Sequence, residues 1–374
     1  MTKILITGDY CPNLRLEGRD HQQVLGSFSK FIDQADLAIT NLECPVTNSA
    51  KAIVKTGPAL KAGKDAVTFL RDAGFGLATL ANNHIMDYGS NGLSDTITAL
   101  EEAGLPYTGA GESATKASKP FEFVHSGQKI AILNFAENEW STTDGIGPGA
   151  NPVDPVQNFS AIRDAKREND HVIVIVHGGH EMYNLPSVRM KQLYRFYAEA
   201  GASAVVAHHT HCTSGYEIYN GTPIFYSIGN FLFDHKVYRD TIWNRGMAVE
   251  LSINGADISF SLIHFDQCGE EAVLTVCGHQ EQGRRNAELQ RLNTIIADDV
   301  QLEASFQGWV LGQRKLFRTF MEPHDFKLLR GLQNRGFAPS MWSAHKKKYL
   351  YNLVRCESHR DILQSILKDE ISHT

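Results

Sequence analysis

The 374-residue sequence contains no run of about 20 consecutive apolar residues, the length that a membrane-spanning helix needs. Its first apolar stretch, residues 3–7, is too short for the core of a signal peptide and ends in a polar turn. The six cysteines show no paired spacing, a pattern typical of free thiols in a reducing compartment. We therefore expect a cytoplasmic protein with no transmembrane segment.

Two signatures of other protein classes are also missing. The sequence has no Gly-x-Ser-x-Gly motif, which argues against a serine hydrolase. The glycine pair Gly109-Ala110-Gly111 stands alone, without the rest of a dinucleotide-binding fingerprint, and we interpret it as a turn.

The formal net charge of −6 is distributed unevenly along the chain. Residues 1–280 carry 21 Lys or Arg against 31 Asp or Glu, whereas residues 281–374 carry 15 against 11. An acidic body argues against general nucleic-acid binding and, in a cleft, attracts divalent cations. A solvated acidic surface is the simpler explanation of the same charge. With 42% hydrophobic and 21% charged residues, the chain has enough apolar material for a folded core.

Short apolar runs alternate with longer amphipathic stretches in the first 280 residues. The amphipathic stretches include 92–103 and 187–200, and the apolar runs lie at 3–7, 37–40, 76–80, 129–135, 171–176, 204–207 and 223–227. This alternation is typical of an α/β fold with buried strands. Residues 247–265 instead alternate with a two-residue period around Asn254-Gly255, which predicts a β-hairpin.

The pattern becomes helical past residue 280, so we divide the chain into a body, residues 1–280, and a helical C-terminal appendage, residues 281–374. We expect the appendage to dock on the body through its aromatic side chains and to contribute no metal ligand. A surface for a partner protein, and contact with anionic polymer or membrane, are the alternatives. The basic run Lys346-Lys347-Lys348 is interpreted as a solvated helix end.

Polar side chains directly follow five of the predicted strands. In chain order, they are Gly8-Asp9, Asn41-Leu42-Glu43, Asn82-Asn83-His84 with Asp87, His177-Gly178-Gly179 and His208-His209-Thr210-His211. Since functional groups of layered α/β proteins gather at the carboxyl ends of strands, we expect these residues to converge in one cleft. Each group alone has a simpler explanation as a turn, a helix cap or a structural histidine. Three histidines within four residues, however, bring no benefit to core packing.

Together these residues form a set of metal ligands. Carboxylates, a carboxamide oxygen and imidazoles suit Zn²⁺, Mn²⁺ or Fe ions, and we expect two divalent ions a few ångströms apart. A carboxylate has to bridge them, and we assign this role to Glu43. The other ligands we assign are Asp9 on one ion, Asn83 and His177 on the other, and His209 and His211, which point in two directions from one loop.

The motifs resemble those of the CapA family of capsule (poly-γ-glutamate) synthesis proteins. The resemblance covers about residues 3–235 and rests on Gly8-Asp9, Asn41-Leu42-Glu43-Cys44-Pro45, residues 80–89, His177-Gly178-Gly179-His180-Glu181, His208-His209-Thr210-His211 and residues 226–231. That family is similar in fold to the calcineurin-like metallophosphoesterases. The resemblance therefore implies a four-layer αββα sandwich, to which this chain adds its helical appendage.

The resemblance also implies a role for each matched residue. It supports the metal ligands given above and makes His84 the acid or electrostatic group beside the phosphoryl oxygens. Asp87 would orient a histidine in the catalytic group, with helix capping as its alternative role. Glu181 would likewise orient a histidine, and substrate contacts are expected for Asn41, His208, Glu181 and Asn230.

The chain departs from the two patterns at three positions. Calcineurin-like enzymes have a histidine two residues after the first aspartate, where this chain has Cys11. A thiolate at Cys11 is a candidate replacement ligand, and a small buried side chain is the alternative. The CapA pattern has tryptophan and glycine where this chain has Gly178 and Ala207.

The resemblance implies a metal-dependent phosphatase or phosphodiesterase, a hydrolase of capsule or surface-polymer biosynthesis. The alternative is a non-catalytic assembly protein that uses the same pocket to bind a polymer or a partner enzyme. The presence of His84 favours catalysis. The expected partners are a phosphorylated small molecule or polymer precursor and capsule-synthesis proteins, and no nucleic acid.

Overall fold

The computed structural model describes residues 1–355 together with 359, 363, 366, 367 and 371. Its contacts divide the chain into two compact units, residues 1–304 and residues 305–374. The sequence predicted the appendage to begin at residue 281, whereas the first unit extends through helix α8 (His279–Ala297) to residue 304.

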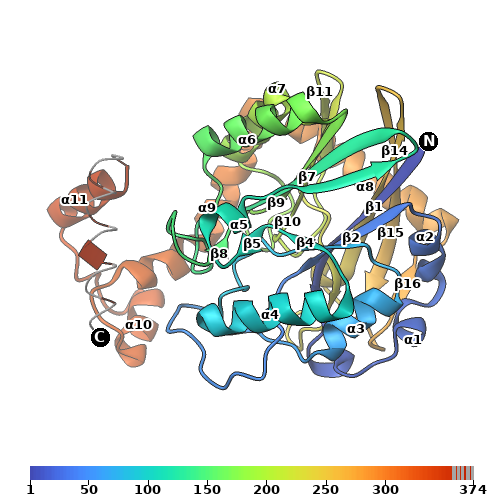
Figure 1. Ribbon diagram of the computed structural model, residues 1–374. Helices are drawn as coiled ribbons and strands as arrows, with labels where there is room; N and C mark the ends of the chain where they lie inside the picture. Colours follow the sequence, from blue (N-terminus) through green and yellow to red (C-terminus); the bar gives the residue numbers. More distant parts are fainter. Residues whose placement is uncertain (356–358, 360–362, 364–365, 368–370, 372–374) are drawn as a thin grey trace. The chain divides into compact units, whose positions relative to one another are not determined.

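The first sheet carries the N-terminal strand near its centre (Figure 1). Strand β1 pairs in parallel with β2 and β13 and antiparallel with β14. The strand order is β16 (Leu274–Val276), β15 (Asp257–Gln267), β14 (Arg245–Asn254), β1 (Thr2–Cys11), β2 (Leu37–Leu42), β3 (Leu77–Thr79) and β4 (Tyr107–Thr108), with β13 (Asn230–Phe233) also beside β1. Strands β14 and β15 form the predicted hairpin, with Gly255 at a positive φ of 62° in its turn.

The second sheet has parallel strands at its centre and antiparallel strands at both edges. Its strand order is β11 (Tyr216–Tyr219), β12 (Thr222–Phe225), β10 (Ala204–His208), β9 (His171–His177), β7 (Gln128–Ala136) and β6 (Phe121–His125). A short antiparallel pair, β5 (Ala110–Gly111) and β8 (Gly149–Ala150), lies outside both sheets.

The alternation of side chains along β1 shows how the layers form. Ile4 and Ile6 join the buried cluster that also holds Ile173 and Ile175 of the second sheet, so this cluster fills the space between the sheets. Leu5 points the other way, into a cluster with residues of α3 and α4. Burying one such side chain contributes roughly 1.5–3 kcal/mol.

Helices cover the outer faces of the two sheets (Figure 1). On the first sheet lie α1 (His21–Leu25), α2 (Ser29–Asp33), α3 (Asp65–Asp72) and α4 (Gly89–Ala103), whereas α6 (Pro155–Glu168) and α7 (Val188–Ala200) pack on strands of the second. This confirms the predicted four-layer αββα sandwich. The remaining short helical elements of the first unit are α5 (Ala114–Ala117), η1 (Leu14–Leu16), η2 (Gly26–Phe28) and η3 (Ile242–Asn244).

The outer helices begin and end where the sequence provides caps. Asp154 accepts hydrogen bonds from two backbone N–H groups at the start of α6, and Pro155 follows it in the first turn. Ser187 caps α7, which ends at Gly201 in the left-handed conformation.

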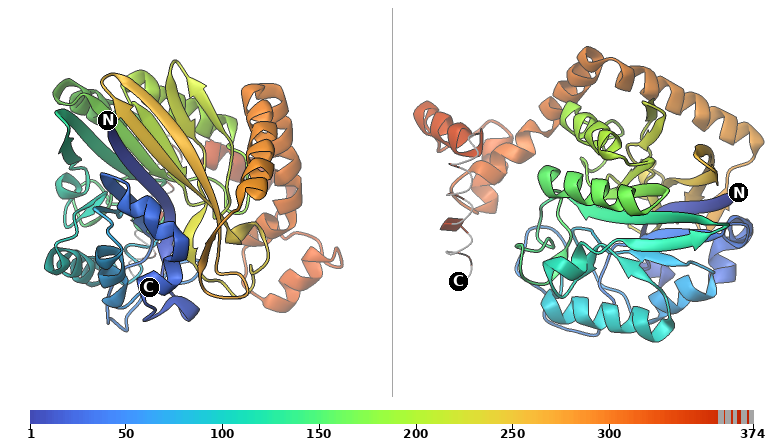
Figure 2. Two further views of the ribbon diagram at one scale, coloured as in Figure 1. Left: turned by 90° about the vertical axis from the view of Figure 1, so that its right-hand side faces the viewer. Right: turned by 45° about the horizontal axis from the view of Figure 1, so that its top comes forward.

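Helix α8 lies beside strands β11 and β15 of the first unit (Figure 2). The helices that follow are α9 (Asp299–Met321), α10 (Lys327–Asn334) and α11 (Ala344–Arg355). Among the described residues, no helix is both long enough and apolar enough to cross a membrane.

Candidate metal centre

The predicted ligands sit where parallel strands of the two sheets end. In the first sheet, the register pairs Asp9 of β1 with Asn41 of β2 and with Asn230 of β13. In the second sheet, His177 ends β9 directly opposite His208, which ends β10. The structure thus brings together side chains that are distant in sequence, such as Asp9 and Asn230.

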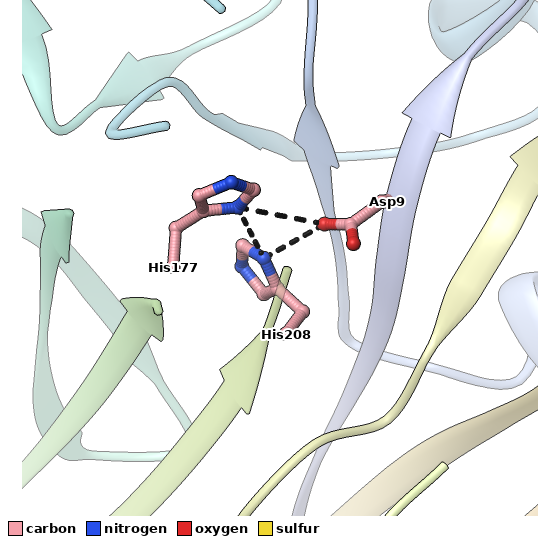
Figure 3. A group of neighbouring side chains, drawn as sticks. All are labelled: Asp9, His177 and His208. Atoms are coloured by element: carbon pink, nitrogen blue, oxygen red, sulfur yellow. Dashed lines mark hydrogen bonds and ion pairs between the residues drawn. The ribbon is translucent and has the colours of Figure 1, made fainter. Parts of the chain in front are cut away.

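Asp9, His177 and His208 form one group of possible metal ligands (Figure 3). One carboxylate oxygen of Asp9 lies 2.8 Å from Nδ1 of His208 and 3.6 Å from Nδ1 of His177. The two imidazole nitrogens are 2.9 Å apart. The sequence predicted a substrate contact for His208. The structure makes its side chain one of the possible metal ligands of this group.

Glu43 belongs to two further groups of possible metal ligands, one with His177 and His209 and one with Asp9 and His211. Its Oε1 is 3.7 Å from Nε2 of His177 and 3.8 Å from Nε2 of His211. The side chain is fully buried, and neither carboxylate oxygen receives a hydrogen bond from any residue that the structure describes. A buried carboxylate without donors is costly unless a cation compensates it, so the residues present fit a metal site.

The protonation states suit metal binding. Burial lowers the pKa of His177 well below its usual value and the pKa of His211 to about 4, so both imidazoles are neutral at physiological pH. Burial by itself would raise the pKa of Asp9, but His208 and His177 hold it well below its usual range. Burial, reinforced by the charges of Asp9 and Glu181, raises the pKa of Glu43. A bound cation would reverse that last effect.

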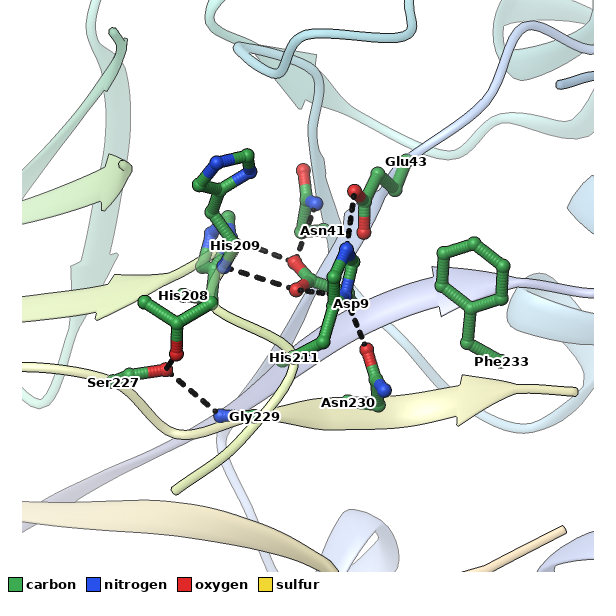
Figure 4. A network of polar contacts seen from close by, with 12 residues as sticks. Asp9, Asn41, Glu43, His208, His209, His211, Ser227, Gly229, Asn230 and Phe233 are labelled. Carbon is green, nitrogen blue, oxygen red and sulfur yellow. Dashed lines mark hydrogen bonds and ion pairs between the residues drawn. The ribbon is translucent and has the colours of Figure 1, made fainter. Parts of the chain in front are cut away.

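The loop after β10 holds its histidines in strained conformations. His209 and His211 have φ values of 100° and 56°, in the left-handed region that non-glycine residues rarely adopt. The backbone N–H of His209 donates to Oδ2 of Asp9 at 3.0 Å (Figure 4). Thr210 donates its hydroxyl to Oγ of Ser227 at 2.8 Å. Such strain persists only where surrounding contacts fix it, and it is concentrated at functional sites.

Asn41 and Asn230 contact predicted ligands. Asn41 donates its amide to Oδ1 of Asp9 at 2.9 Å, and Nδ1 of His211 lies 2.8 Å from the amide oxygen of Asn230 (Figure 4). These contacts fix the orientation of a carboxylate and an imidazole, as the neighbours of metal ligands commonly do. A part for either side chain in substrate binding stays a prediction.

His84 makes a chain of contacts with Asp87 and Lys55. Nδ1 of His84 lies 2.7 Å from Oδ2 of Asp87, and the ammonium group of Lys55 pairs with the other oxygen of that carboxylate. The side chains of Asp87 and Lys55 are 0% and 4% exposed, and Nζ of Lys55 is also 3.2 Å from Nδ1 of His84. With Asp87 accepting from Nδ1, the Nε2 edge of the ring is the one left for a ligand.

A comparison with known families identifies the family of the chain. The profile of the family described as bacterial capsule synthesis protein PGA_cap matches residues 3–235, more than half of the chain. The chain belongs to this family. PGA biosynthesis protein CapA of Bacillus subtilis (strain 168) is 38% identical over 237 residues, which cover 61% of this chain and 62% of that protein. Capsule biosynthesis protein CapA of Bacillus anthracis is 34% identical over 215 residues, covering 55% of this chain and 52% of that protein.

The chain thus spans between half and two thirds of the length of these relatives, whose activities do not transfer to it directly. Among solved structures, a hypothetical protein from Thermus thermophilus aligns with 71% of this chain and 99% of its own. The TM-score of that alignment is 0.47, at 21% sequence identity. Every predicted ligand lies inside the segment that the PGA_cap family matches.

Glu139 and Lys55 lie in this family segment and contact residues of the predicted site, but neither was predicted from the sequence. The amide of Asn83 donates to Glu139 at 3.4 Å, and its oxygen lies 2.9 Å from Nε2 of His177. Glu139 also reaches Nε2 of His209 at 3.8 Å. Its position shortly after the predicted strand 129–135 is the signal that would have found it. Lys55 lies in a long loop, where no sequence signal marks it.

Glu181 and Cys11 lie at the edge of the predicted site. Glu181 is exposed, and its charge acts on Glu43 and His211. Cys11 is buried and belongs to none of the three ligand groups found among the described residues. A hydrogen bond with Cys44, together with burial, raises the pKa of Cys11 and so disfavours the thiolate that binds metal.

Proposed function

We propose that the protein is a metal-dependent phosphoesterase, a phosphatase or phosphodiesterase that acts in capsule or surface-polymer biosynthesis. The observation that carries this proposal is the fully buried carboxylate of Glu43, which has no hydrogen-bond donor among the described residues and faces His177 and His211. A structural carboxylate would be paired with a donor, whereas a bridging ligand has to keep both oxygens available.

The ligand groups suggest how two divalent ions, Mn²⁺, Zn²⁺ or Fe, would be held. Asp9 and His211 would serve one ion, Asn83, His177 and His209 the other, and Glu43 both. His208 is a further candidate beside Asp9. Bound ions supply charge neutralisation for a phosphoryl group and a water of lowered pKa as nucleophile.

We assign His84 as the residue that would contact the reacting phosphoryl group. Its Nδ1 donates to Asp87, so Nε2 is the nitrogen left for the reacting group, and in the doubly protonated ring Nε2 would donate a hydrogen bond to a phosphoryl oxygen or to the leaving oxygen. The side chain is 10% exposed, which leaves part of the ring accessible. Lys55 compensates the buried charge of Asp87 and so keeps that carboxylate available to orient the ring.

The substrate and setting follow from the family and the site chemistry. The printed names of the two relatives refer to PGA and capsule biosynthesis, so we propose a phosphorylated small molecule or polymer precursor as substrate and capsule-synthesis proteins as partners. We also place the reaction in the cytoplasm, since the described cysteines are free, as is typical of a reducing compartment.

Metal analysis combined with a phosphatase assay tests this function. Protein purified without a histidine tag is analysed for bound metals, then supplied with Mn²⁺ or Zn²⁺ and assayed on an aryl phosphate and an aryl phosphodiester. We expect two ions per chain and hydrolysis of at least one ester. If no ion binds, the metal centre is refuted. Stable metal binding without turnover on either ester would favour the non-catalytic assembly function.

A further inference from the structure

The second compact unit exposes a large apolar surface. Within residues 305–355, no side chain that the structure describes is buried. Exposed large apolar side chains of α9, α10, α11 and their connections include Val310, Leu311, Phe317, Phe320, Phe326, Leu328, Leu332, Phe337, Met341, Tyr349 and Val354. Exposed apolar surface of this extent marks an interaction site in a natural protein.

The same segment is strongly basic. Residues 305–355 contain ten Lys or Arg and two Asp or Glu, a formal charge of +8, whereas residues 1–304 contain 24 against 36, a formal charge of −12. Lys346, Lys347 and Lys348 are all exposed at the start of α11. From sequence alone this run was interpreted as a solvated helix end; the structure adds the apolar side chains that are exposed around it.

Helix α10 shows how the apolar and the basic side chains of this segment are arranged. At helical spacing, Leu328, Leu329 and Leu332 fall on one face, and Lys327 and Arg330 fall on another. Leu328 is 80% exposed, and none of the side chains in this helix is buried. A helix with Leu on one face and Lys or Arg on the other is typical of helices that lie in a membrane interface.

We infer that residues 305–355 bind the surface of an anionic lipid membrane, with the apolar side chains inserted among the lipids and the basic side chains at the headgroups. Lipid fits this surface better than a soluble polyanion, which pairs with cations and leaves Phe and Leu side chains in water. It also fits better than a second copy of the chain, because the apolar side chains are spread over three helices and their connections. The segment lies outside residues 3–235, the region that the family matches.

Vesicle co-sedimentation of the full-length protein tests the inference. The vesicles are phosphatidylcholine, either alone or with about a third of phosphatidylglycerol. We expect binding to the anionic vesicles, weaker binding at high salt, and little binding to phosphatidylcholine alone, because anionic lipid attracts each basic residue near the surface. Equal binding to both vesicle types would overturn the inference.

Two variants assign the binding to this segment. Reversing three charges in Lys346→Glu, Lys347→Glu and Lys348→Glu together is expected to weaken binding about 100-fold or more, since each Lys contributes about fivefold. Replacing Phe326, Leu328 and Phe337 by Ser is expected to weaken it at low salt as well, because apolar insertion is lost. The matched control reverses exposed charges of the first unit, at Lys51, Lys64 and Arg167, and is expected to bind as the wild type does.

Three results would contradict membrane binding by this segment. Vesicle binding that both triple variants retain would place the contact elsewhere. Binding of soluble polyglutamate, with anionic vesicles left unbound, would assign the surface to a polyanion. Concentration-dependent self-association that the Ser variant abolishes, again without vesicle binding, would assign it to a second copy. None of these measurements depends on phosphoesterase activity, so they are independent of the proposed function.

Discussion

Lys55 and His84 meet at the two oxygens of one buried carboxylate: Asp87 lies 2.7 Å from Nδ1 of His84 and pairs with the ammonium group of Lys55. Lys55 comes from the loop between β2 and α3, and Asp87 also accepts the backbone N–H of Leu60 from the same loop at 2.7 Å. The loop and the catalytic candidate are therefore coupled through Asp87.

Replacing Lys55 tests this coupling. We expect Lys55→Met to lower kcat about tenfold or more with unchanged metal content, because a hydrogen bond to a charged group contributes about 1.5–3 kcal/mol. Lys55→Arg is expected to restore part of the rate. Lys61→Met, on the same loop, is the control, since Lys61 is exposed and its ammonium group contacts the backbone of Ser49 and the ring of Tyr88 rather than Asp87. An equal loss of rate in the control variant would indicate a general effect of the loop.

His84 and His209 are expected to separate turnover from metal binding. His84→Ala is expected to keep its metal and lose about 10²–10⁴-fold in kcat, the contribution of a positioned acid. His209→Ala is expected to lose metal and activity together, because His209 belongs to a ligand group with Glu43 and His177. Metal analysis and steady-state kinetics of both variants distinguish the two roles. An equal loss of metal in both variants would make His84 a metal ligand.

Replacing Glu43 is expected to have opposite effects on the free energy of unfolding with and without metal. In metal-free protein at pH 8, Glu43→Gln is expected to raise the free energy of unfolding by about 1–3 kcal/mol, because it removes a buried carboxylate that lacks a donor. With Mn²⁺ or Zn²⁺ added, the wild type is expected to gain more stability than the variant. Urea unfolding measures both, with the exposed Glu102→Gln as control. A metal-free variant less stable than the wild type would show that Glu43 has a structural role.

His211 is expected to make the metal-free protein sensitive to acid. Its pKa falls to about 4 on folding, so between pH 6.5 and 4 the unfolded state binds the proton that the folded state excludes. Stability from this group is full above pH 6.5 and decreases by about 3 kcal/mol as the pH falls to 4. Urea unfolding across this range is expected to show a shallower decrease for His211→Gln. An identical pH dependence in both proteins would exclude this histidine as the cause.

Truncation locates the boundary of the body. A chain that ends at residue 304 is expected to stay folded and keep its metal, since the first compact unit ends there. A chain that ends at residue 280 lacks α8, whose Leu289 and Ile296 are buried, and is expected to aggregate. Light scattering and metal analysis compare the two. A monodisperse, metal-bound protein of 280 residues would place the boundary where the helical sequence pattern predicted it.

The sequence patterns by themselves determined an α/β fold and which residues occupy the strand ends, whereas the αββα layering was implied by the resemblance to a known family. Strands such as β1 and β9 are short, continuous apolar runs, and a buried parallel strand requires that pattern. The polar residues at the carboxyl ends of these strands, such as Asp9 and His177, then have to lie at one edge of their sheets. Local patterns are sufficient here because strand, turn and ligand are neighbours in the chain.

Only the tertiary structure decided which of these side chains meet and what supports them. The contact of His208 with Asp9 depends on the packing of the two sheets, and that of Lys55 with Asp87 depends on the path of a loop with no periodic pattern. The place of α8 in the body depends on apolar contacts with β11 and β15 that a helical periodicity does not specify. In each case the stabilising contacts join residues that are distant in sequence, so a local sequence pattern does not predict them.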